Sequence, residues 1–202
     1  MATDASALNT RPLDPDDVER LRRLFYRLSP RTRYFRFFSL VTDPPEGCLQ
    51  RLASVDHRTR EALAALSGDE IVAVARYDRL IDRDSVAEVA VVVEDSWQRQ
   101  GVARDLMTAL ARSARDRGVE TFAGTTLSDN PAIGAFVRAL AAEPRWRWDG
   151  GCRLVEVDLR RELVAATPAR QPSDSRASGS ITGRIRASQV VPRTKPPTTS
   201  VR

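Results

Sequence analysis

Residues 93–103, with the sequence VEDSWQRQGVA, decide the fold class. They follow an apolar run over residues 87–93 that only Glu88 interrupts, which predicts a strand covered on both faces. After a short polar loop, an amphipathic helix is expected over residues 101–117. Backbone N–H groups at the start of a helix have no partner within it, and the helix dipole adds positive potential there. The stretch therefore predicts an anion site, suited to phosphates, where strand and helix join.

The residues on both sides of this stretch predict a mixed α/β sheet. Helical spacing and capping residues indicate three earlier helices, over residues 15–28, 31–38 and 45–54. Two apolar stretches separated by a Ser-Gly-Asp-Glu turn predict a hairpin with strands at 61–66 and 71–80. Later elements are expected to be a strand at 121–126, a helix at 131–142, a turn at 148–151 and a strand at 153–159. Strand, helix, strand in the middle implies parallel pairing, whereas the hairpins imply antiparallel strands.

Composition excludes several classes of protein. No run approaches the roughly 18 consecutive apolar residues of a membrane-spanning helix. The first residues contain neither the basic nor the apolar segment of a secretory signal, so a cytoplasmic location is expected. The chain has two cysteines, Cys48 and Cys152, and one histidine, His57, which are too few for a structural zinc site. No metal is therefore expected, and no Gly-x-Ser-x-Gly nucleophile motif is present.

The composition changes near residue 166. Residues 167–202 are rich in Pro, Ser, Thr, Gly and Arg and carry seven basic residues against one acidic residue, Asp174. Because this mixture buries too little apolar surface to offset chain entropy, we expect one folded domain over residues 1–166 and a disordered basic tail over residues 167–202. The chain's net charge of +5 then resides in the tail, and the domain is close to neutral. Since the tail lacks aromatic or helical readout elements, nucleic acid is not an expected partner.

Residues 98–103, QRQGVA, resemble motif A, Gln/Arg-x-x-Gly-x-Gly/Ala, of the GNAT superfamily of acetyl-CoA-dependent N-acetyltransferases. Asn130, after the next expected strand, stands where the family often has an asparagine that lines the cofactor cleft. The resemblance covers roughly residues 7–160. Within the superfamily, the segments RYFRFF (33–38), VDH (55–57) and AEVA (87–90) are most similar to the bacterial Pat group of protein-lysine acetyltransferases. Some members of that group carry a cyclic-nucleotide-binding domain, which is not expected in a chain of this length.

The resemblance implies the acyl-CoA N-acyltransferase (GNAT) fold, a mixed and mostly antiparallel sheet with a central parallel strand pair, flanked by helices. In this fold the strand matching residues 87–93 splays from the strand matching 121–126, and backbone groups in the gap bind the pantetheine of acetyl-CoA. A backbone N–H near Val91 or Val92 polarises the thioester carbonyl. The diphosphate rests on the amides of residues 99–103. The implied acetyl-CoA site comprises Val91, Val92, Val93, Gln98, Arg99, Gln100, Gly101, Val102, Ala103 and Asn130.

Glu88 is the candidate catalytic residue. A carboxylate inside an apolar strand costs free energy unless it is paired or used. It stands ten residues before Gln98, as does the general base of the Pat-like proteins. The resemblance therefore implies that Glu88 removes a proton from the substrate ammonium, because only the neutral amine has a lone pair for attack. The alternative is a structural glutamate that pairs with Arg76 or Arg79 across the hairpin.

For several other side chains the sequence predicts a structural role or leaves two roles open. Asn130 binds the pantetheine or caps the following helix, and one side chain can do both. Arg99 reaches a cofactor phosphate or points to solvent. His57 is expected to make a local hydrogen bond, since no partner motif accompanies it. Tyr34 and the phenylalanines beside it are expected in the core, and Cys152 is expected to be a small buried group.

One departure from the family pattern concerns the acid that protonates the leaving thiolate. Many GNAT enzymes place a tyrosine in the helix after the asparagine, where this chain has Phe136 or Val137. Neither side chain can donate a proton, so the acid is unassigned.

The first hypothesis is acetyl transfer to a primary amine, with a protein lysine as acceptor and a polyamine, an aminoglycoside or an amino acid as small-molecule alternatives. The second hypothesis is a CoA-binding sensor or interaction module with little catalysis.

Overall fold

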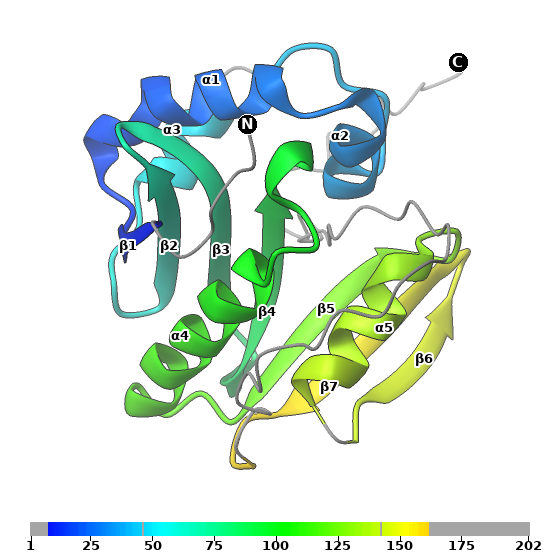
Figure 1. Cartoon of the computed structure of the whole chain (residues 1–202). Helices are drawn as coiled ribbons and strands as arrows, with labels where there is room; N and C mark the ends of the chain where they lie inside the picture. The colour runs from blue at the N-terminus through cyan, green and yellow to red at the C-terminus, as the bar shows by residue number, and fades with distance from the viewer. Residues whose placement is uncertain (1–7, 46, 142, 162–202) are drawn as a thin grey trace, which may run out of the picture.

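The computed structural model describes residues 8–45, 47–141 and 143–161, which form a seven-stranded sheet with helices on both faces (Figure 1). The strand order is β1-β2-β3-β4-β5-β7-β6, and every neighbouring pair is antiparallel except β4 and β5. The strands are β1 (Asn9–Pro12), β2 (Arg60–Ser67), β3 (Glu70–Leu80), β4 (Arg83–Val93), β5 (Thr121–Leu127), β6 (Arg145–Asp149) and β7 (Cys152–Asp158). The predicted fold class is confirmed. The predicted boundary at residue 166 and the tail over residues 167–202 lie outside the described residues.

The helices begin and end near the positions that the sequence predicts. They are α1 (Val18–Arg27), α2 (Pro30–Phe37), α3 (Cys48–Ala53), α4 (Val102–Asp116) and α5 (Pro131–Leu140). Ser29 caps α2, because its side chain accepts a hydrogen bond from the backbone N–H of Thr32. Glycines with left-handed φ bound α4, at Gly101 (89°) before the helix and at Gly118 (82°) after it. The largest difference is α3, which is shorter than the predicted 45–54.

Alternating side chains of β2, β3 and β4 separate the core into two layers. One layer packs under α4 and includes Ala87 and Leu110. The other packs against α1 and α3 and includes Leu24 and Val74. Figure 1 shows α4 in front of β3 and β4, and α5 in front of the part of the sheet formed by β5, β7 and β6. Among the helices that the structure describes, none is long and apolar enough to cross a membrane.

The edge strand β1 is absent from the elements that the sequence predicts, and β6 is implied only by the hairpin turn expected at 148–151. β1 has the polar sequence NTRP, which shows no apolar alternation. β6 alternates arginine with tryptophan, a period-two pattern typical of a half-buried strand. Each becomes a strand because a neighbour offers it a free edge, β2 for β1 and β7 for β6. Proline is tolerated in such an edge position, as at Pro12.

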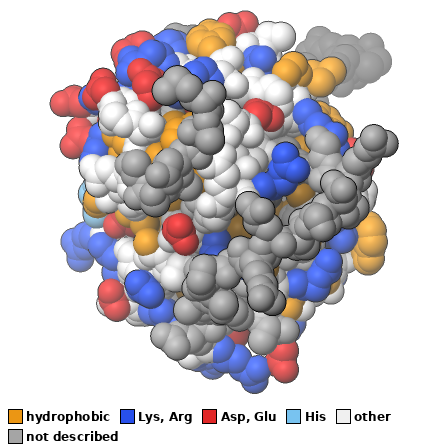
Figure 2. All heavy atoms as spheres, in the orientation of Figure 1, with side chains coloured by type: hydrophobic (Ala, Val, Ile, Leu, Met, Phe, Trp, Pro, Cys, Tyr) orange, Lys and Arg blue, Asp and Glu red, His pale blue; other side chains and the backbone are white. Residues whose placement is uncertain are grey.

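Ion pairs hold α1 beside the β2–β3 turn and beside the end of β4. Arg23 Nε and Arg27 Nη1 each lie 2.7 Å from an oxygen of Glu70. Arg27 Nε also lies 2.9 Å from Glu94 Oε2, directly after β4. Figure 2 shows acidic and basic side chains together at the upper left, over α1. Partly exposed pairs of this kind contribute at most about 1 kcal/mol each, so they orient α1 more than they stabilise it.

Candidate active site

β4 and β5 form a parallel pair only at their first residues. The ladder runs from Val86–Thr121 to Glu88–Ala123 and ends there, although both strands continue. Figure 1 shows the two arrows diverging beyond this point. Of the described strands, only β3 pairs with residues 89–93, so the edge of this segment that faces β5 has backbone groups without a strand partner. The three valines of the predicted acetyl-CoA site lie in this segment.

A small, mostly apolar cavity lies on the α5 side of the gap, and we call it the α5-side cavity. Its lining is Val89, Ala90, Val91, Met107, Phe122, Gly124, Thr125, Thr126, Ile133, Phe136, Val137, Leu140, Val155 and Val157. An apolar slot with backbone groups along one wall fits an extended, mostly apolar arm such as pantetheine. Phe136 and Val137 both line it, so the place where the family often has a tyrosine carries no proton donor here.

The loop between β4 and α4 has the geometry of an anion site. Arg99 and Gly101 have left-handed φ values of 63° and 89°, and α4 starts at the next residue. The hydrogen bonds within the described chain include none donated by the backbone amides of residues 99–103. These amides lie at the positive end of a fifteen-residue helix. The loop therefore fits a diphosphate without displacing any protein acceptor.

The glutamine side chains of the motif hold the loop rather than extend from it. Gln98 Nε2 donates to the carbonyl oxygen of Val93 at 2.9 Å, which closes the turn at the end of β4. Gln100 Nε2 donates to the carbonyl oxygen of Ser96 at 2.8 Å. Both side chains therefore stabilise the backbone conformation of the loop.

Asp95, which the sequence does not single out, connects this loop to α2. Its carboxylate accepts hydrogen bonds from Ser29 Oγ (2.7 Å), from the backbone N–H of Ser29 (2.9 Å) and from Thr32 Oγ1 (2.8 Å). Gln98 Nε2 adds a longer contact to Thr32 Oγ1 at 3.4 Å. The loop and the start of α2 are thus one hydrogen-bonded unit. The helix-capping role of Ser29 is readable in the sequence, but its partner 66 residues away is not.

Glu88 lines a groove of about 960 Å³, which we call the strand-lined groove because its lining residues all lie on strands. They are Leu80, Arg83, Glu88, Ala123, Gly124, Thr125, Arg145, Trp146, Arg147, Leu154, Val155 and Glu156. Of the two arginines proposed as structural partners, Arg76 binds Asp78 through Nε (3.1 Å) and Nη2 (2.9 Å). Arg79 donates to the carbonyl oxygens of Asp84 and Arg117. Glu88 itself belongs to the last residue pair of the β4–β5 ladder, beyond which the two strands separate.

The strand-lined groove and the α5-side cavity share three lining residues, Gly124, Thr125 and Val155. A Cβ at Gly124 would lie 3.3 Å from Val155 Cγ1 and 3.9 Å from Val89 Cγ2, so a side chain at this position would crowd both valines. Glycine therefore allows close packing beside the place where β4 and β5 separate.

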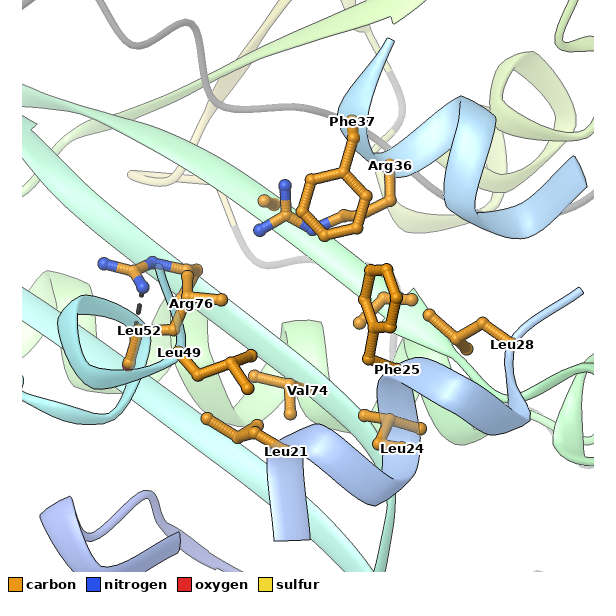
Figure 3. A pocket seen from close by; sticks show the side chains of 12 residues that line it. Leu21, Leu24, Phe25, Leu28, Arg36, Phe37, Leu49, Leu52, Val74 and Arg76 are labelled. Carbon is orange, nitrogen blue, oxygen red and sulfur yellow. Dashed lines mark hydrogen bonds between the residues drawn. The ribbon is translucent and has the colours of Figure 1, made fainter. Parts of the chain in front are cut away.

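A third, small cavity lies between α1, α2 and α3 and the sheet (Figure 3). Figure 3 shows leucines and Phe25 of α1 on one side, and Arg36 and Phe37 of α2 above them. Arg36 stacks on the Phe37 ring at 5.3 Å. Ala90 and Val92 of β4 complete the wall. Because alternate residues of a strand share a face, this cavity lies on the same side of β4 as Glu88.

The remaining candidate side chains have structural contacts. His57 Nδ1 lies 2.7 Å from Glu61 Oε1, which confirms the local hydrogen bond. Phe35 is in the core, but Tyr34, Phe37 and Phe38 are only half-buried, so the prediction of core packing was wrong for these three. Asn130 is fully buried at the N-cap of α5, but its side chain makes no capping hydrogen bond. Cys152 is only half-buried, so the prediction of a buried cysteine was wrong; it begins β7 next to an exposed turn. The described residues contain no metal-binding group of His, Cys, Asp and Glu.

The comparison with family models gives one match, described as the acetyltransferase (GNAT) family, over residues 18–141. The chain belongs to this family. The matched segment begins with α1 and ends directly after α5, so it contains the motif loop, the gap and Glu88. Acetyl-CoA is the usual acyl donor of GNAT enzymes.

Curated relatives of this GNAT chain include bacterial acetyltransferases. Acetyltransferase Pat of Mycolicibacterium smegmatis is 36% identical over 152 residues, which are 74% of this chain and 45% of the relative. An acetyltransferase of Pseudomonas aeruginosa is 31% identical over 127 residues, which are 61% of this chain and 68% of the relative. The chain thus spans less than half the length of Pat.

Solved structures of the GNAT fold match most of the described residues. The GNAT domain of S. lividans PAT is 32% identical with a TM-score of 0.69, covering 75% of this chain and 90% of that one. A cAMP-binding acyltransferase from Mycobacterium smegmatis is 29% identical with a TM-score of 0.51, covering 75% of this chain and 43% of that one. A PaiA N-acetyltransferase from Thermoplasma acidophilum, in complex with coenzyme A, shares the fold at 11% identity and a TM-score of 0.60, covering 75% of this chain and 98% of that one.

Proposed function

We propose that this protein transfers the acetyl group of acetyl-CoA to a primary amine, a lysine side chain of a protein, by direct attack. The observation that carries the proposal is the opening between β4 and β5, which begins where their ladder ends at Glu88; the α5-side cavity and the groove that contains Glu88 share lining residues beside it. A donor held on one side of the sheet and an acceptor on the other react through this opening. Similarity to Pat, a named acetyltransferase, supports the same activity.

The donor side is provided by backbone groups. The amides of residues 99–103 bind the diphosphate, and Arg99 is placed to contribute its guanidinium. The free edge of Val91, Val92 and Val93 hydrogen-bonds the pantetheine arm as an added strand would. A backbone N–H near Val91 or Val92 polarises the thioester carbonyl, and such donors are commonly worth about 3 kcal/mol in acyl transfer.

The acceptor side depends on Glu88. Its carboxylate takes a proton from the substrate ammonium, directly or through water, and leaves an amine with a lone pair. The amine attacks the thioester carbonyl carbon, so a C–N bond forms and the C–S bond breaks. The sulfur leaves with the bonding electrons as a thiolate. Since Phe136 and Val137 have no proton to give, solvent protonates the thiolate.

Replacement of the base tests this mechanism. Glu88→Gln is nearly isosteric, and we expect acetyl transfer to fall by roughly 10²–10⁴-fold with acetyl-CoA binding retained. Thiol release measures the rate, and a thermal shift with acetyl-CoA measures binding. Glu120→Gln, which neutralises an exposed glutamate just before β5, is the matched control and leaves both unchanged. A wild-type rate in Glu88→Gln assigns the base to another group.

The second candidate function is a CoA-binding sensor with little catalysis. The apolar pair Phe136 and Val137 in the α5-side cavity favours it, because the usual thiolate acid is missing. A panel of lysine-bearing proteins and small amines distinguishes the two functions. Stabilisation by acetyl-CoA without thiol release for any acceptor supports the sensor. Release with small amines alone supports a small-molecule acetyltransferase.

A further inference from the structure

The strand-lined groove carries more basic than acidic side chains around Glu88. Its charged lining consists of three arginines, Arg83, Arg145 and Arg147, and two glutamates, Glu88 and Glu156. Arg83 Nη2 lies 3.3 Å from Glu156 Oε1, and Arg145 Nη2 lies 3.2 Å from Glu156 Oε2. One carboxylate is therefore shared between two guanidinium groups, which leaves positive charge uncompensated.

Arg147 has no ion pair with any carboxylate in the described part of the chain. It follows Arg145 by two residues on β6, so both point to the same face of the sheet. The side chains of Arg83 and Arg145 are 52% and 72% exposed and are accessible to a ligand. Arginine presents a planar fork of donors that matches a carboxylate, which makes this rim a receptor for carboxylate groups.

We propose that the acceptor is a lysine in a protein segment whose neighbouring residues are acidic, and that Arg83, Arg145 and Arg147 bind those acidic side chains. The proposal rests on the proposed function, because it takes Glu88 as the group that receives the lysine. One negative charge attracts the ammonium into the groove, while the rim of arginines repels additional positive charge. Polyamines and aminoglycosides carry several positive charges and are therefore disfavoured.

The dimensions of the groove favour a protein segment over a small amino acid. The arginines come from two different strands, β4 and β6, with β5 and β7 between them in the sheet. A single small molecule with one carboxylate pairs with one arginine at a time. A peptide segment with acidic residues on both sides of a lysine reaches both strands while its lysine lies beside Glu88.

Peptides that differ only in the charge of the neighbouring residues test the proposal. One lysine is flanked by glutamate, glutamine or arginine in three otherwise identical peptides, and thiol release is measured with saturating acetyl-CoA. We expect kcat/KM to fall from the glutamate to the glutamine to the arginine peptide, by roughly three- to five-fold per step. The differences shrink at high salt, since the Debye length at 0.1 M is only about 10 Å.

Charge reversal at the rim identifies the arginines. Arg147→Glu is expected to remove or invert the preference, and Arg147→Ala, which perturbs β6 less, is expected to weaken it. Arg112→Glu makes the same change of charge on the exposed face of α4 and leaves the preference intact. A thermal melt of each variant confirms that it is folded.

The outcomes separate this inference from the proposed function. Equal kcat/KM for the three peptides overturns the inference and leaves acetyl transfer intact. A preference that persists in both Arg147 variants overturns the assignment to the rim. Absence of release from every peptide, with acetyl-CoA still raising the melting temperature, also overturns the inference. Absence of both release and stabilisation overturns the proposed function itself.

Discussion

The two sides of the β4–β5 gap offer a ligand different kinds of groups. On the α5 side these are backbone amides from one short loop and the free edge of β4. In the strand-lined groove they are side chains from five strands, β3 to β7. Backbone groups are the same in every sequence that adopts the conformation, whereas side chains change with each substitution. Under the proposed function, the α5 side therefore suits a cosubstrate common to the family, and acceptor specificity is expected to come from the strand-lined groove.

The two sides are also connected differently to the rest of the molecule. The donor loop is fixed to α2 through Asp95 and Gln98 and to α1 through the contact of Glu94 with Arg27. The groove is bounded by β6, an edge strand whose arginines are exposed. A rigid donor site beside an adaptable acceptor surface is what direct transfer requires, because the acyl group must be held in place while acceptors vary.

Adding a side chain at Gly124, which lines both the α5-side cavity and the strand-lined groove, has the largest expected effect. Gly124→Val inserts a branched side chain between Val155 and Val89, so we expect acetyl transfer to fall by roughly 10²-fold, with Gly124→Ala intermediate. Thiol release is compared with the melting temperature of each variant. Gly134→Ala in α5, where the added methyl meets only the flexible Arg138 side chain, is the control and keeps the wild-type rate. Full activity in a folded Gly124→Val variant means that donor and acceptor meet elsewhere.

Two glycines, one before and one after α4, allow a matched test of the proposed diphosphate site. Gly101→Ala and Gly118→Ala impose the same left-handed strain at the two ends of the helix, and each is expected to lower the free energy of unfolding by about 1 kcal/mol. Only Gly101→Ala places a methyl group beside the amides of the anion site. We expect its KM for acetyl-CoA to rise about ten-fold, while Gly118→Ala leaves KM unchanged. An equal KM in the two variants, measured by steady-state kinetics, removes the diphosphate from this loop.

Replacement of Arg99 is expected to have a smaller effect, which decides whether its side chain contacts a cofactor phosphate or points to solvent. Its φ of 63° is strained for a residue with a side chain, so Arg99→Gly is expected to stabilise the fold by about 0.5 kcal/mol after the greater freedom of the unfolded chain is included. If the guanidinium contacts a phosphate, the same change weakens acetyl-CoA binding by a few-fold. Denaturant unfolding and a binding titration measure the two effects. Stabilisation with unchanged affinity means that the side chain points to solvent.

Several elements were predictable because their signals are local. The loop at residues 98–103 and the start of α4 are contiguous in the sequence, and glycine at position 101 marks the left-handed turn. The capping residue Ser29 and the apolar periods of β2 to β4 are also short-range features. The edge strand β1 lacks such a signal, since pairing with β2 rather than an apolar pattern forms it.

The sequence by itself determined the family and the order of the helices and central strands, and it identified the predicted anion loop and the candidate base, because each depends on residues a few positions apart. Only the tertiary structure decided that Glu88 shares a groove with Arg83, Arg145 and Arg147, that this groove and the α5-side cavity have Gly124 in common, and that Asp95 joins the loop to α2. The physical reason is sheet order: β4 lies next to β5, and β7 and β6 follow, so strands distant in the chain become neighbours only after pairing.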